Sequence, residues 1–125
     1  MPASTPDIRV KRIYEPAQPD DGARILVDRL WPRGVSKQKA ALALWLKEIA
    51  PTTELRVWFD HDPAKFTAFS SRYRAELDGN TAALAQVAPF LEQGRVTLLY
   101  GAHDEQHNHA QVLAGYLRGD VTPQG

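Results

Sequence analysis

The sequence predicts one α/β domain over residues 8–118, built on an open, mostly parallel sheet flanked by helices on both faces. Three short apolar runs are predicted as strands, and segments with helical spacing of apolar residues separate them. The length of 125 residues suits a single domain, and 43% hydrophobic and 24% charged residues are typical of a globular protein. We expect residues 1–7 and 119–125 to form flexible tails.

The composition argues against several classes of function. Lysine plus arginine and aspartate plus glutamate number 15 each, so the formal net charge is zero, and no overall positive field favours nucleic acid or a membrane surface. The absence of cysteine excludes disulfides, cysteine-bound zinc and thiol catalysis. No apolar run approaches the ~20 residues that span a membrane, and the N-terminus lacks the apolar core of a signal peptide. We therefore expect a cytoplasmic protein.

The first two strands are predicted at residues 8–14 and 25–27. Apolar Ile8 and Val10 alternate with charged residues, which indicates a strand with one solvated face. Residues 15–22 are rich in proline, aspartate and glycine and are typical of a loop, whereas 25–27 is a short, buried apolar run. Because the link between the two strands is short, a hairpin remains an alternative to a parallel crossover.

Four helices are predicted between the second and third strands. Each begins at a residue that can cap a helix, and the longer ones show apolar residues at helical spacing. Ser36 caps the first and Pro51 ends it, while Pro89 is expected to kink or shorten the last. The predicted segments are 37–50, a short helix capped by Thr53, a helix from Asp62-Pro63, and a helix from Asn80 to the stop at Gly94.

A buried strand over Val96–Tyr100 and a final helix over residues 105–118 complete the predicted fold. In open parallel sheets, ligands bind outside the carboxyl ends of the strands. The polar turns that follow residues 27 and 100 meet at one rim if their strands are parallel. We therefore expect the functional site at that rim.

The turn over residues 28–34 is predicted to bind an anion. Its two arginines lie four apart around a rigid Trp-Pro corner, and their planar guanidinium groups suit phosphate or carboxylate, with the tryptophan stacking on the ligand. In the alternative interpretation, the aspartate pairs with one arginine and the tryptophan belongs to the core. The predicted binding residues in this turn are Asp28, Arg29, Trp31, Arg33 and Gly34.

The turn over residues 100–109 holds three of the four histidines. Histidine titrates near neutral pH and can act as an acid or a base, and the start of the following helix favours anions. His103 and His107 also have the spacing of two metal ligands, which a carboxylate could complete. Alternatively, Asp104 caps the helix and the histidines are exposed polar residues. The predicted catalytic residues are His103, Asp104 and His107, and the predicted binding residues are Tyr100 and Asn108.

His61, between Asp60 and Asp62, is a further predicted binding residue. Either carboxylate could orient its imidazole for acid–base chemistry. Alternatively, Asp62 is a helix N-cap and His61 covers Trp58. The sequence contains no nucleophile-elbow serine and no glycine-rich phosphate loop, and it specifies no cofactor.

Several motifs along residues 8–117 form a distinctive set. The string Asp-Arg-Leu-Trp-Pro-Arg-Gly at 28–34 is the most specific, and others are Trp45-Leu46-Lys47, Trp58-Phe59, Tyr73-Arg74-Ala75-Glu76-Leu77 and His107-Asn108. The set resembles the YeaO-like branch of the bacterial domain of unknown function 488 family. This resemblance implies a Rossmann-like fold, parallel first strands and a cytoplasmic bacterial protein, but no established reaction. A sister branch has cysteines where this chain has Tyr100 and Asn108, so thiol chemistry does not transfer.

Two functional hypotheses remain open. The first is a small-molecule site at the rim for a phosphate- or nucleotide-like anion, in a hydrolase or transferase. The second is a non-catalytic interaction module, in which Trp31, Trp58 and Tyr100 form a surface for a protein partner or a homodimer.

Overall fold

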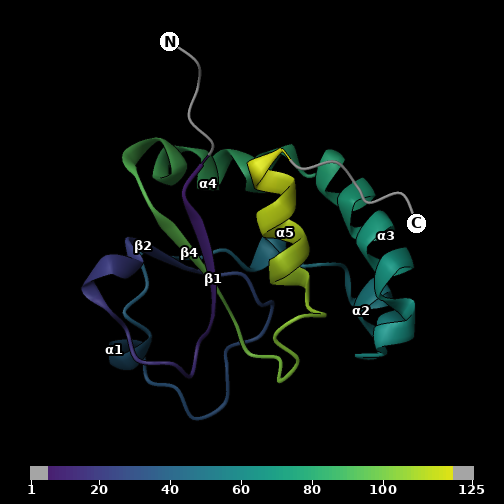
Figure 1. Ribbon diagram of the computed structural model, residues 1–125, viewed down its shortest axis with the longest axis horizontal. Helices are drawn as coiled ribbons and strands as arrows, with labels where there is room; N and C mark the ends of the chain where they lie inside the picture. Colours follow the sequence, from purple (N-terminus) through teal and green to yellow (C-terminus); the bar gives the residue numbers. More distant parts are fainter. Residues whose placement is uncertain (1–5, 120–125) are drawn as a thin grey trace.

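The computed structural model describes residues 6–119 and contains a four-stranded, fully parallel sheet (Figure 1). Across the sheet, the strand order is β1-β4-β2-β3. Ile8 of β1 and Ala23 of β2 both pair with Val96 of β4. The predicted α/β class is confirmed, and the hairpin alternative is wrong because β4 lies between the first two strands. The strands are β1 (Ile8–Arg12), β2 (Ala23–Leu26), β3 (Leu44–Trp45) and β4 (Val96–Tyr100).

The helices are divided unequally between the two faces of the sheet. Ile25, Leu98 and Tyr100 face the larger core, which contains buried residues of α2, α3, α4 and α5. A smaller cluster on the opposite face includes Leu26, Leu99 and Ala40 of α1. Figure 1 shows α5 beside β1, with α3 further from the sheet. The helices are α1 (Lys37–Ala40), α2 (Thr53–Phe59), α3 (Phe66–Asp78), α4 (Thr81–Gln93) and α5 (His109–Arg118).

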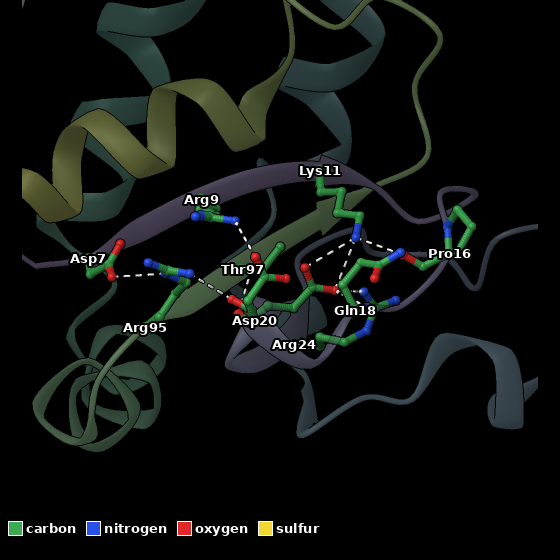
Figure 2. Close-up of polar contacts among 10 residues, drawn as sticks. Asp7, Arg9, Lys11, Pro16, Gln18, Asp20, Arg24, Arg95 and Thr97 are labelled. Carbon is green, nitrogen blue, oxygen red and sulfur yellow. Dashed lines mark hydrogen bonds and ion pairs between the residues drawn. The ribbon is translucent and has the colours of Figure 1, made fainter.

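Charged side chains anchor the β1–β2 loop to the second face of the sheet (Figure 2). Lys11 Nζ and Arg24 Nη1 donate to the buried carboxylate of Asp21 at 3.1 and 2.6 Å. Thr97 Oγ1 donates to the backbone carbonyl of Asp21 at 2.6 Å. Arg95 Nη1 donates to the carbonyl of Asp20 at 2.9 Å. These bonds hold a short connection across the sheet between two parallel strands.

The predicted helix over residues 37–50 is wrong beyond its first turn. α1 ends at Ala40, and its C-cap Ala41 has a left-handed φ of 48°. The chain then extends along β2, where Ala43 N donates to Arg24 O at 2.8 Å and Leu46 N to Leu26 O at 2.9 Å. The predicted apolar stripe is therefore split between the two faces, with Leu46 and Ile49 in the larger core and Leu42 and Trp45 against the smaller cluster.

The other helices differ from the prediction mainly at their ends. α2 is capped by Thr52 rather than Thr53, and Asp62 caps a short 3-10 turn that leads into α3. α4 continues through Pro89 to Gln93 and is not shortened. α5 begins at His109 instead of residue 105, because the buried Asn108 is its N-cap. Residues 101–108 thus remain a loop.

None of the helices within residues 6–119 is long and apolar enough to cross a membrane. Residues 1–5 and 120–125 of the predicted tails lie outside the described residues. Of the remainder, Asp7 is tied to the sheet, since its carbonyl accepts from Val96 N at 2.9 Å and its carboxylate from Arg95 Nε at 2.9 Å.

Candidate functional site

A cavity of about 520 Å³ lies beyond the carboxyl ends of β2 and β4. The turn after β2, α2 with the segments on either side of it, Phe69 of α3 and the loop before α5 form its walls. This is the end of a parallel sheet at which ligands bind. Its apolar lining consists of Leu30, Ala50, Pro51, Phe59, Phe69 and Ala102.

The structure brings seven of the predicted site residues together around this cavity and leaves four outside it. Two polar lining residues, Arg56 and His109, were not predicted. The seven are Asp28, Arg29, His61, His103, Asp104, His107 and Asn108. The four predicted residues that do not line the cavity are Trp31, Arg33, Gly34 and Tyr100.

Two guanidinium groups contribute positive charge to the cavity wall. Arg29 Nη2 donates to the carbonyls of Ala50 and Pro51 at 3.2 and 3.3 Å. Its Nε is buried and has no hydrogen-bond partner among the described residues. Arg56, on α2, is exposed, and its side chain has no polar partner within residues 6–119. Both arginines therefore keep N–H donors that the protein does not satisfy.

Asp28 joins the two strand ends to α5. Its Oδ2 accepts from Gly101 N at 2.8 Å, and its Oδ1 lies 3.2 Å from His109 Nε2. The same Nε2 lies 3.0 Å from the carbonyl oxygen of Val27. Because a carbonyl only accepts, Nε2 carries the proton and donates to Val27. His109 is thereby fixed against the end of β2.

The loop before α5 is organised by Asp104. Its Oδ1 accepts from Gln106 N at 2.9 Å and His107 N at 3.0 Å, and its Oδ2 lies 2.9 Å from His107 Nδ1. These bonds, led by those from the backbone of His107 and Gln106, hold the pKa of Asp104 below its usual range. Asp104 therefore stays a carboxylate at neutral pH and orients the His107 ring. It does not cap α5 as one interpretation predicted.

Asn108 has a structural role beside its place in the cavity wall. Its Oδ1 accepts from Gln111 N at 3.0 Å, and its Nδ2 donates to the carbonyl of Asp104 at 2.9 Å. The side chain thus connects the first turn of α5 to the preceding loop. Only 2% of Asn108 is exposed.

His61 lies at a bend of unusual backbone conformation at the cavity edge. Asp60 and His61 have φ angles of 48° and 53°, both left-handed. Such angles cost energy in residues other than glycine, and two in succession turn the chain sharply after α2. His61 is exposed, and its ring centroid lies 6.4 Å from that of Phe59. Neither flanking carboxylate bonds to its imidazole among the described residues; Asp62 instead accepts from Ala64 N.

The predicted residues outside the cavity lie on the second sheet face, at the surface or in the core. Trp31 Nε1 donates to Val35 O at 2.7 Å, and its ring meets Trp45 edge to face at 5.2 Å. Arg33 and Gly34 are exposed. Tyr100 is buried in the larger core, and this burial chiefly raises the pKa of its hydroxyl.

The alternative sites predicted from sequence are not assembled as expected. Trp31 packs on the smaller cluster, Trp58 against the larger one, and Tyr100 is buried, so the three do not form one aromatic surface. Within residues 6–119, no three histidine, aspartate or glutamate side chains are grouped to hold a metal ion. His103 lines the cavity but is exposed.

Neither Arg56 nor His109 has a local sequence pattern that strongly indicates a place in the cavity wall. Arg56 occupies an ordinary helical position, and only the packing of α2 beside the strand ends brings it to the cavity. His109 belonged to the histidine cluster, but the predicted start of α5 at residue 105 obscured its place. As the first residue of α5, it lies directly against the end of β2.

Comparison with known proteins identifies the family. A family described as the inactive DUF488-N3 subclade matches residues 7–124. The uncharacterised protein YeaO of Escherichia coli is 46% identical over 112 residues, which cover 90% of this chain and 97% of YeaO. The uncharacterised protein Rv3073c of Mycobacterium tuberculosis is 43% identical over 112 residues, covering 90% and 94% of the two chains. No solved structure matches the chain. This chain is therefore a YeaO-like member of the DUF488 family and belongs to the group described as the inactive DUF488-N3 subclade.

Proposed function

We propose that this protein binds a small organic anion in the cavity at the carboxyl end of its sheet. The observation that carries the proposal is the pair Arg29 and Arg56 in the cavity wall, where the exposed side chain of Arg56 has no polar partner within residues 6–119. Guanidinium groups bind carboxylate and phosphate oxygens in pairs of hydrogen bonds.

The rest of the cavity suits an apolar body attached to that anion. Phe59 and Phe69 stack with ring centroids 4.2 Å apart, and Leu30 and Pro51 add aliphatic surface. A volume of about 520 Å³ is in the range of small-molecule sites. The description of the subclade as inactive supports binding without turnover.

Calorimetric titration with three aromatic probes tests this proposal. We expect phenyl phosphate and benzoate to bind and neutral benzyl alcohol to bind at least tenfold more weakly. Arg56→Gln should weaken anion binding about tenfold, which corresponds to about 1.4 kcal/mol for a lost charged contact. Arg33→Gln is the matched control, since Arg33 is exposed and lies outside the cavity. Equal affinity for the neutral probe, or equal losses in both variants, would refute the proposal.

A second candidate function, hydrolysis of a bound ester, is favoured by the Asp104–His107 pair. Asp104 Oδ2 lies 2.9 Å from His107 Nδ1 and orients the ring, so that Nε2 is left to accept a proton from water. The water oxygen would then attack the ester, and the departing alkoxide would take up the proton. Release of p-nitrophenol from p-nitrophenyl phosphate or acetate measures this activity. Rates equal in the wild type and His107→Gln would exclude it.

A further inference from the structure

We propose that anion binding in this cavity is linked to proton uptake by His107, so that the site binds its ligand more tightly as the pH falls towards 6. The inference rests on the proposed anion-binding function and adds its regulation. All four histidines of the chain, at positions 61, 103, 107 and 109, line this cavity. Histidine is the side chain whose charge ordinarily changes between pH 5 and 8.

The other charges of the cavity wall cancel. The carboxylates of Asp28 and Asp104 balance the guanidinium groups of Arg29 and Arg56 when the histidines are neutral. An anion that enters the cavity then has no net positive charge to meet. Each protonated histidine adds one positive charge, and in a partly enclosed site that charge acts at short range.

Two of the histidines have a carboxylate beside them, and they differ in whether the ring nitrogen Nε2 already has a hydrogen-bond partner. His109 Nε2 donates to Val27 O, and its side chain is only 17% exposed. His107 Nδ1 is bonded to Asp104 Oδ2, and its Nε2 has no hydrogen-bond partner among the described residues. A neutral His107 therefore offers an acceptor at Nε2, whereas an imidazolium offers a donor there and remains paired with Asp104.

The groups that face His107 come from α3, from its own loop and from the opposite wall of the cavity. From α3 it meets the ring of Phe66 edge to face at 5.2 Å. On its own loop it contacts Asp104, which stays ionised because backbone N–H groups lower its pKa, and Glu105 is exposed nearby. Across the cavity the charged groups are Asp28, Arg29 and Arg56. Among the side-chain types in this site, histidine is the one whose charge ordinarily changes near neutral pH.

Calorimetric titration with sodium sulfate at pH 6, 7 and 8 and constant ionic strength tests the inference, because sulfate keeps its charge over this range. If sulfate binding is coupled to the protonation of one histidine, the association constant should fall as that histidine loses its proton. The fall should be up to about tenfold for each pH unit. Repeating each titration in two buffers of different ionisation enthalpy counts the protons taken up. In His107→Gln we expect the pH dependence to flatten, whereas Arg33→Gln, which lies outside the cavity, should retain it.

The outcomes separate this inference from the function on which it rests. Sulfate binding with no pH dependence and no proton uptake would overturn the proton linkage and leave anion binding intact. The same pH dependence in wild type and His107→Gln would remove His107 from the linkage. No binding of sulfate or phenyl phosphate at any pH would overturn the proposed function itself. The proton count on the wild-type protein needs no variant, so it stands even if a variant folds poorly.

Discussion

Asp21 places a carboxylate beneath the β1–β2 loop, where 3% of the residue is exposed. Burial opposes its ionisation, but hydrogen bonds from the Gln18 backbone, Lys11 and Arg24 outweigh that cost and lower its pKa (Figure 2). Because the pKa is lower in the folded chain, the ionised form stabilises the fold above pH ~4. This contribution is lost as the pH falls through the lowered pKa.

Replacing Asp21 by Asn should lower the free energy of unfolding by about 3 kcal/mol at pH 7, because Lys11 and Arg24 lose a buried counter-charge. Below pH 4 the difference from the wild type should shrink. Urea denaturation at pH 7 and pH 3 measures both effects. Asp20→Asn is the control, since its side chain is 64% exposed and the pair with Arg9 contributes at most about 1 kcal/mol. Equal losses for the two variants would contradict this assignment.

Gly22 shows a second constraint at the residue scale. Its φ is 68°, and a Cβ there would collide with the backbone carbonyl of Arg95. Gly34 also has a positive φ, of 79°, but has open space around it. Gly34→Ala should cost only the strain of a left-handed backbone conformation at alanine, about 1–2 kcal/mol. Gly22→Ala should destabilise the protein by at least about 2 kcal/mol more, because its Cβ also collides with the backbone of Arg95. Thermal and urea denaturation of both variants give the difference; similar losses would argue against the close approach.

At the scale of secondary-structure elements, residues 37–50 have a local pattern that predicts a helix where the structure has a short strand. Leu42, Trp45, Leu46 and Ile49 have helical spacing. However, two of them pack on each face of the sheet, because residues 44–45 pair with β2. Pairing with a distant strand satisfied the backbone and buried both sets of side chains, and this outweighed the helical preference. No local signal marks a two-residue strand of this kind.

Ala41, the C-cap of α1, gives a test at this scale. Ala41 adopts a left-handed conformation that glycine takes without strain. Ala41→Gly should leave stability unchanged or raise it by about 0.5 kcal/mol, because relief of strain offsets the greater entropy of the unfolded chain. Ala40→Gly, within the helix and buried, should lower it by about 1 kcal/mol. Urea denaturation distinguishes these changes, and a marked loss in Ala41→Gly would contradict the described helix end.

At the scale of the whole molecule, β4 is the strand whose side chains enter both hydrophobic clusters. It pairs with β1 and β2, all five of its residues are buried, and its alternate side chains enter the two clusters. The loop that follows β4 carries the candidate site, but the bonds of this loop are mainly local. Stability should therefore be high along the strand and low along the loop.

Hydrogen exchange followed by mass spectrometry tests this contrast. Amides of residues 97–100 should exchange only through global unfolding, whereas those of residues 102–106 should exchange at least about a hundredfold faster through local opening. Saturating phenyl phosphate should slow exchange in the loop and leave the strand unchanged if the proposed site is occupied. Strand amides that exchange as fast as the loop would contradict a central role for β4.

The sequence by itself determined the α/β class, the central strand over Val96–Tyr100 and most helix starts between residues 52 and 81. These features depend on hydrophobic period, capping residues and proline, which act within a few positions of the chain. It also predicted the rim at which the candidate cavity lies, because parallel strands bring their carboxyl ends to one edge. Seven predicted site residues line the cavity found there.

Only the tertiary structure decided which side chains of those turns share a cavity. Arg33 and Trp31 lie in the same specific motif as Arg29, yet one is exposed and the other packs on the opposite face. Arg56 comes from a helix more than 20 residues later and adds the second guanidinium group to the cavity wall. The physical reason is that the direction of a side chain in a turn depends on long-range packing and hydrogen bonds. Residue type and spacing do not contain that information.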